Sequence, residues 1–201
     1  EWEWYGNIWD MIKQMFVLTP PIKSQSFDGG VNLYCGTFAI LLIGIYIFNT
    51  KIKWYEKLKN VILLVFLMMS FNNVLLNYIW HGFHDQYGIP NRFSFLFIFV
   101  LLTMGYETVT KIDKDQVVGV VAGVIVAFGF LVYADKNMDL DRNIIIFTWV
   151  LFVVYSVVML VISMLKGRGR FVVSLVMAIL CLTEIVFGAA KGYESNGTVY
   201  I

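Results

Sequence analysis

Long runs of apolar residues alternate with short polar segments along most of the chain. A run of about 20 apolar residues is long enough for a helix to cross the roughly 30 Å hydrocarbon core of a bilayer. The runs are continuous, whereas the strands of an outer-membrane barrel alternate apolar and polar positions. The pattern therefore predicts an all-α, polytopic transmembrane helical bundle of about six spans, over residues 31–50, 60–80, 93–109, 117–134, 144–165 and 171–190.

The segment before the first span, residues 1–30, is too polar to span but is rich in aromatic side chains. Trp and Tyr favour the level of the lipid headgroups. Apolar residues recur here at helical spacing, at Ile8, Met11, Ile12, Met15 and Phe16. The spacing predicts an amphipathic helix over residues 7–18 that lies in the membrane interface, packs across the mouth of the bundle, or does both. We expect three regions: an interfacial segment 1–30, a bundle 31–190 and a tail 191–201.

The composition agrees with a membrane protein, because 59% of the residues are hydrophobic and 14% are charged, against about 25% charged in ordinary soluble domains. The formal net charge of +1 gives no basic field to gather nucleic acid, so we expect no nucleic-acid partner. In the fourth predicted span, Gly119 and Gly123 form a small-xxx-small pattern, which favours close packing of two helices.

Positive charge predicts how the bundle sits in the membrane, because cytoplasmic loops keep an excess of Lys and Arg. The loops after the first, third and fifth spans hold nine cations: Lys51, Lys53, Lys57, Lys59, Lys111, Lys114, Lys166, Arg168 and Arg170. These loops are expected in the cytoplasm. The segment 1–30, the loop 81–92 and the tail then face outward, in a multi-pass protein of the plasma membrane.

The densest polar cluster outside the basic loops joins the second and third spans and contains His81, His84, Asp85, Asn91 and Arg92. One helical turn would bring the His81 imidazole and the Asp85 carboxylate together. The planar fork of Arg92 matches phosphate oxygens, while His and Asn side chains can donate to phosphate or to sugar hydroxyls. Three interpretations stay open: a substrate-binding site, a divalent-metal site on His81, His84 and Asp85, or an interfacial loop of snorkelling side chains.

Three polar residues are expected inside the membrane, where polar groups are costly unless paired: Asn73, Asn77 and Glu184. Asn73 and Asn77 lie four residues apart and share a helix face that leads toward His81. They either line a wet cavity or hydrogen-bond between helices. Glu184, in the sixth span, needs a partner that the pattern does not name.

Asp28 and Asn32 stand at the outer boundary, just ahead of the first span. Asp28 either caps the start of that helix or forms a ligand-binding turn, because Gly29 and Gly30 allow a ligand to approach the backbone closely. Asn32 is a further hydrogen-bond partner for a ligand at this mouth.

Three segments of the chain, FDGGVNLYCGTFAILL, WYEKLK and NYIWHGFHDQYGIPNRFSFLFIFVLL, resemble the YfhO family of bacterial integral membrane proteins. The resemblance covers about residues 26–106 and is carried by Trp80-His81-Gly82, Pro90 and Arg92-Phe93-Ser94-Phe95. It implies a glycosyltransferase of the GT-C type at the outer face of the membrane. Such an enzyme moves a sugar from a polyprenyl-phosphate carrier to a cell-envelope polymer such as lipoteichoic acid.

The resemblance also implies that the acidic residue credited with base or metal work lies in an outer loop nearer the N-terminus of the full protein. We therefore expect this chain to be an internal or C-terminal fragment without that loop, and no catalytic residue is assigned to it. Arg92 is expected to hold the phosphate, His81 to donate to phosphate or sugar, and Asp28 to serve the acceptor. No metal ligand or cofactor is assigned, although a divalent metal stays open.

Two other functions remain to be distinguished from sugar transfer. A transporter or flippase of a lipid-linked substrate would use the same mouth, but it would need polar residues along the full depth of the bundle. A non-catalytic membrane scaffold would tolerate alanine at His81 and Arg92.

Overall fold

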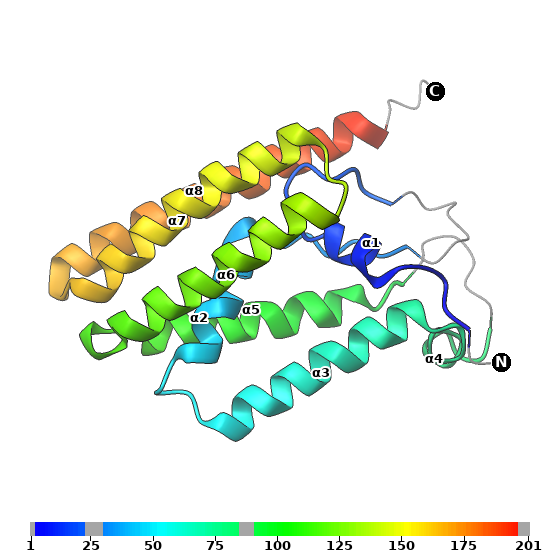
Figure 1. Cartoon of the computed structure of the whole chain (residues 1–201), viewed down its shortest axis with the longest axis horizontal. Coiled ribbons are helices and arrows are strands. Elements are labelled where there is room, and N and C mark those ends of the chain that lie inside the picture. The colour runs from blue at the N-terminus through cyan, green and yellow to red at the C-terminus, as the bar shows by residue number, and fades with distance from the viewer. Residues whose placement is uncertain (1–2, 23–29, 85–90, 197–201) are drawn as a thin grey trace.

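The computed structural model describes residues 3–22, 30–84 and 91–196, and in these residues it contains helices and no strand. The helices are α1 (Ile8–Lys13), α2 (Thr37–Phe48), α3 (Trp54–Asn72), α4 (Val74–Trp80), α5 (Ser94–Lys111), α6 (Val117–Asn137), α7 (Arg142–Met164) and α8 (Gly167–Asn196), with a 3₁₀ turn, η1, at Lys114–Gln116. Long helices run side by side along the bundle (Figure 1). The predicted all-α bundle is confirmed.

Four stretches of helix among the described residues are long and apolar enough to cross a membrane: α5, η1 with α6, α7, and α8 as far as Lys191. The chain is thus a membrane-embedded protein. The predicted six spans agree roughly with this count, and the differences concern the first and second predicted spans. The first predicted span is helical only over α2, and the second is divided between α3 and α4.

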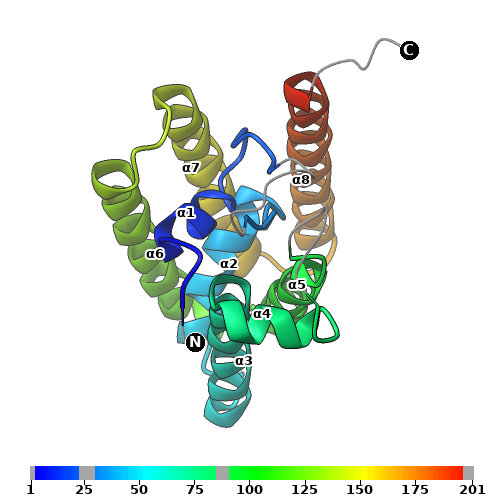
Figure 2. The same cartoon turned by 90° about the vertical axis from the view of Figure 1, so that its right-hand side faces the viewer.

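The short helix α2 lies in the centre of the bundle and contacts α5, α6 and α7 (Figure 2). Its 12 residues rise only about 18 Å, less than the hydrocarbon core. Residues 30–36 before it are not helical, and Gly36 has φ +102°. The predicted span over 31–50 is therefore wrong in its first six residues.

Glycines let α2 and α6 approach each other closely. A Cβ atom at Gly123 of α6 would lie 2.4 Å from Ile45 Cα of α2, and one at Gly119 would lie 2.7 Å from the Phe48 carbonyl oxygen. Real Cβ atoms essentially never come so close to other heavy atoms. The small-xxx-small prediction is confirmed as a packing feature.

The interruption between α3 and α4 falls at Asn73, where the N-terminal segment pairs with the chain. Asn73 has extended backbone and its side chain caps α4, accepting from Leu76 N at 3.0 Å. Trp4 and Asn73 form an antiparallel bridge, and Tyr5 N donates to Asn72 O at 2.8 Å. Backbone groups freed by the break thus find partners in residues 3–6, which is why the continuous second span was predicted wrongly.

The predicted N-terminal helix over 7–18 is the single short helix α1, whose first turn is capped by Asn7. It packs across one end of the bundle, near α2 and α6 (Figure 2). Trp9 contacts Tyr133 of α6 at 5.2 Å between ring centroids, and Phe16, which is fully buried, stacks on Phe130 at 6.2 Å. We call the end that carries α1 and α4 the mouth end.

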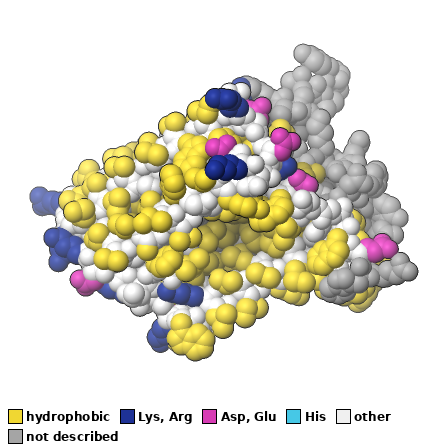
Figure 3. Space-filling model, viewed as in Figure 1, with side chains coloured by type: hydrophobic (Ala, Val, Ile, Leu, Met, Phe, Trp, Pro, Cys, Tyr) yellow, Lys and Arg dark blue, Asp and Glu magenta, His cyan; other side chains and the backbone are white. Residues whose placement is uncertain are grey.

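The opposite end, which we call the basic end, consists of the segments 49–53, 112–116 and 165–167. Lys51 pairs with Asp113 there, and Lys111 pairs with Glu107. Basic side chains gather at this end of the molecule (Figure 3). The chain therefore separates a basic end from a mouth end along the axis of the bundle.

Candidate functional site

The C-terminal end of α4 fixes His81 at the mouth end. Both the backbone N–H of His81 and its ring atom Nδ1 lie within hydrogen-bond distance of the Asn77 carbonyl oxygen, at 3.0 and 2.9 Å. A carbonyl can only accept, so Nδ1 carries the proton and Nε2 keeps a lone pair when the ring is neutral. The Nε2 atom is buried and has no hydrogen-bond partner among the described residues. His84 follows after a turn at Gly82 and Phe83 and is exposed.

Asn91 fixes the backbone next to Arg92, which lies two residues before α5 begins at Ser94. Asn91 is buried in a left-handed conformation with φ +49°. Its amide nitrogen donates to Gly30 O at 2.8 Å, and its side-chain oxygen accepts from Asn77 Nδ2. The following residue, Arg92, is exposed. We call the end of α4 with His81 and the residues 91–93 before α5 the two arms of the mouth. Asn77 contacts both arms: its carbonyl oxygen bonds to His81 and its side-chain amide bonds to Asn91.

Aromatic contacts bring the two arms to one edge of the bundle. The Trp80 ring stacks on Phe93, the residue after Arg92, with centroids 4.7 Å apart and planes inclined by 12°. The His81 ring packs edge-to-face with the same Phe93 ring, and the two ring centroids are 6.0 Å apart. The residues at the end of α4 thus pack against Phe93, just before α5, so that His81 and Arg92 belong to one packed unit.

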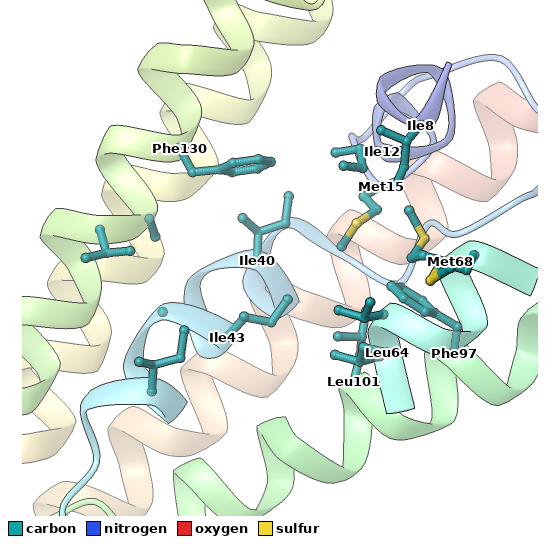
Figure 4. Close-up of a pocket in the computed structure, with 16 residues that line it drawn as sticks. Ile8, Ile12, Met15, Ile40, Ile43, Leu64, Met68, Phe97, Leu101 and Phe130 are labelled. Carbon is teal, nitrogen blue, oxygen red and sulfur yellow. The ribbon is translucent and has the colours of Figure 1, made fainter. Parts of the chain in front are cut away.

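An apolar groove of about 350 Å³ lies below the mouth, between α2, α3, α5 and α6, with α1 across its end. Side chains from these elements point into a common space (Figure 4). They include Ile8, Ile12, Met15, Ile40, Ile43, Leu64, Met68, Phe97, Leu101 and Phe130. The rim residues Val65 and Val126 are about half exposed, and Figure 3 shows the hollow on this face. The groove therefore opens on the side of the bundle.

A ladder of ring contacts connects the groove with the mouth. Phe71 of α3 packs against Phe93 at 5.0 Å and against Phe97 at 6.0 Å between centroids. Phe93 touches His81, while Phe97 lines the groove. The polar mouth and the apolar groove are thus connected by contacts between Phe71, Phe93 and Phe97.

A family model described as the bacterial membrane protein YfhO matches residues 1–196 of the chain. The chain belongs to the YfhO family of bacterial membrane proteins. The resemblance seen over residues 26–106 is therefore confirmed, and it extends over nearly the whole YfhO chain. No curated protein and no solved structure matches the chain.

Glu184, one of the polar residues predicted inside the membrane, accepts three hydrogen bonds from other parts of the chain. It is 3% exposed and accepts from Tyr34 Oη at 2.9 Å, Thr37 N at 2.6 Å and Tyr155 Oη at 2.7 Å. Thr37 is the first residue of α2, whose N-cap Gly36 offers no side-chain acceptor. The carboxylate of α8 therefore caps a helix N-terminus from another helix, where the helix dipole favours negative charge.

The other predicted residues are placed as follows in the YfhO chain. Asn73 caps α4 and donates to Glu3 O at 3.2 Å. Asn32 is exposed and exchanges hydrogen bonds with the backbone of Ile22, at 2.9 and 3.3 Å. Asp28 and Asp85 lie outside the described residues. Asn32 thus bonds to the backbone of Ile22, whereas Asn73 and Asn77 hydrogen-bond to other parts of the mouth end.

No group of three or more metal-ligating side chains occurs within residues 3–22, 30–84 and 91–191 of the YfhO chain. The metal site on His81, His84 and Asp85 includes a residue beyond these ranges and stays a prediction. The sequence pattern did not predict the groove, because its lining comes from five separate elements.

Proposed function

We propose that this YfhO-family chain is part of a membrane glycosyltransferase that moves a sugar from a polyprenyl-phosphate carrier to a cell-envelope polymer such as lipoteichoic acid. The reaction takes place at the outer face of the bacterial plasma membrane. The observation that supports this proposal best is the apolar groove joined by aromatic contacts to a mouth that carries Arg92.

The dimensions of the groove favour a hydrocarbon chain as its occupant. The groove has a volume of about 350 Å³, and the side chains that line it are apolar. A narrow flexible chain that enters from the bilayer fits this space and its wholly apolar lining.

The mouth supplies the polar part of the site. Arg92 is exposed beside the stacked rings of Trp80 and Phe93. Its guanidinium group can offer two parallel hydrogen-bond donors to a phosphate. When the sugar leaves the carrier, negative charge grows on that phosphate. A fixed cation at this place therefore stabilises the transition state more than the bound substrate.

The placement of charge supports an outer position for the mouth. The basic end lies opposite the mouth end, and basic loops favour the cytoplasm. Transport of a lipid-linked substrate is less well supported, because Asn73, Asn77 and Glu184 all hydrogen-bond to groups of the protein itself.

The proposal is tested in the full-length protein by replacing Arg92 with Ala and with Lys. Sugar transfer from a polyprenyl-phosphate donor to the envelope polymer should fall about 10²–10³-fold in Arg92→Ala. Arg92→Lys should recover only part of it, since Lys lacks the bidentate fork. The matched control is Lys136→Ala, which removes another exposed cation from the same end. Unchanged transfer in both Arg92 variants at normal membrane levels would overturn the proposal.

A further inference from the structure

The Nε2 atom of His81 is buried and finds no hydrogen-bond partner in the part of the chain that the structure describes, and the His81 ring contacts Phe93, the residue after Arg92. Buried polar atoms of this kind are rare in native proteins and call for an explanation. The ring cannot turn to expose Nδ1 instead without losing the 2.9 Å hydrogen bond to the Asn77 carbonyl. The structure thus keeps one lone pair of the imidazole in a fixed direction and unused.

We infer that His81 Nε2 is the catalytic atom that accepts the proton of the attacking hydroxyl. The inference rests on the proposed function; it assigns the base to a histidine of this chain, whereas the family resemblance credits base or metal work to an acidic residue in an outer loop nearer the N-terminus. A neutral imidazole with Nδ1–H bound to a carbonyl is the arrangement in which Nε2 acts as a base. Because Nε2 is buried, neighbouring side chains must shift before the hydroxyl reaches it.

The framework around His81 supports a catalytic position more than a general structural one. Asn77 is 1% exposed and holds His81 through its backbone oxygen while its side chain holds Asn91. A single residue therefore sets the distance between the base and the Arg92 arm. Such support from neighbouring hydrogen bonds is what keeps catalytic groups in a productive geometry.

The proposed step balances as a displacement at the anomeric carbon of the sugar. The hydroxyl oxygen of the envelope polymer forms a bond to that carbon while its proton passes to His81 Nε2. The bond from the same carbon to the carrier phosphate breaks, and its electron pair leaves on the phosphate oxygen beside Arg92. The imidazolium then returns its proton to water, so that neither an oxidant nor a reductant is needed.

The experiment uses the purified full-length protein and three substitutions. His81→Asn leaves an amide that can still donate to the Asn77 carbonyl but removes the ring atom Nε2. His81→Ala leaves a space that free imidazole can fill. Lys136→Ala is the control for expression and handling. Transfer is measured against the concentration of the polyprenyl-phosphate sugar, with and without imidazole.

We expect kcat to fall about 10²–10³-fold in both His81 variants, within the usual range for loss of a general base, while KM for the lipid donor changes little. Imidazole should restore transfer at least tenfold in His81→Ala but not in His81→Asn. A merely structural role for His81 would not be rescued by imidazole.

Three outcomes would overturn the inference: full activity of His81→Asn, a change confined to KM, or no rescue of His81→Ala by imidazole. A loss that added Mn²⁺ reverses in the variants would also overturn it, because His81 would then be a metal ligand. These failures leave the proposed function standing as long as the wild type transfers sugar and Arg92→Ala does not. Absence of transfer by the wild-type protein would refute both.

Discussion

Gly123 of α6 tests how closely the central helix α2 is held. An added Cβ would lie 2.4 Å from Ile45 Cα and 2.5 Å from Ile45 N, whereas ordinary contacts begin at 3.4 Å. The atoms in the way belong to the backbone, so no rotamer change can relieve the clash. To accept Gly123→Ala, the two helices must therefore separate by about 1 Å, the difference between 3.4 and 2.4 Å.

The magnitude follows from two opposing terms. Overpacking of a tight core typically costs about 1–3 kcal/mol, and this site should lie near the upper end because the clash involves backbone. Replacing a glycine in a helix returns about 0.5–1 kcal/mol of chain entropy. The net expectation for Gly123→Ala is a loss of about 2 kcal/mol, which is a change of roughly 30-fold in the unfolding equilibrium.

Gly129 lies on the same helix and provides the matched control, because a Cβ there meets nothing within 4 Å. Gly129→Ala should stabilise the protein by about 0.5–1 kcal/mol. Both variants are compared with the wild type by unfolding the purified full-length protein with sodium dodecyl sulfate and following circular dichroism. Equal stability of the two variants would refute the close contact between α2 and α6.

Two further changes test the contacts of Glu184 and Asp113. Glu184→Ala leaves the hydroxyls of Tyr34 and Tyr155 and the Thr37 N–H without their acceptor, so it should destabilise the fold by about 2 kcal/mol or more. If the variant and the wild type unfolded at the same concentration of sodium dodecyl sulfate, this role would be contradicted. The hydrogen bond from Lys51 holds the pKa of Asp113 below its ordinary value of 3.8. The pair therefore stabilises the fold above that pH, and this contribution is lost as the pH falls through the lowered pKa. Asp113→Asn should be less stable than the wild type at pH 7 and equal to it near pH 2; a stability gap that stays constant with pH would show that the pair does not act through charge.

The bundle could be predicted, and the candidate mouth proposed, because their signals are local in the sequence. Apolar runs identify helices by themselves, and His81 and Arg92 stand in one short polar segment beside Trp80 and Phe93. Trp80 and Phe93, whose rings stack, are only 13 positions apart in the chain. The same closeness in the sequence explains why the candidate site was found there.

The interruptions could not be predicted because each depends on a distant partner. The break at Asn73 is compensated by residues 3–6, about 70 positions away, and hydropathy over 60–80 shows no sign of them. The late start of α2 at Thr37 depends on Glu184, 147 positions later. A pattern read over one window of the chain has no access to either contact.

The cap that Glu184 places on α2 has a consequence for the order in which the protein assembles in the membrane. When α2 leaves the ribosome, it is too short to span the bilayer, and the acceptor for the Thr37 N–H has not yet been synthesised. Stable burial of α2 must therefore wait until α8 has been inserted. The centre of the bundle is completed late, and truncations within α8 should leave α2 exposed to membrane quality control even though its own residues are intact.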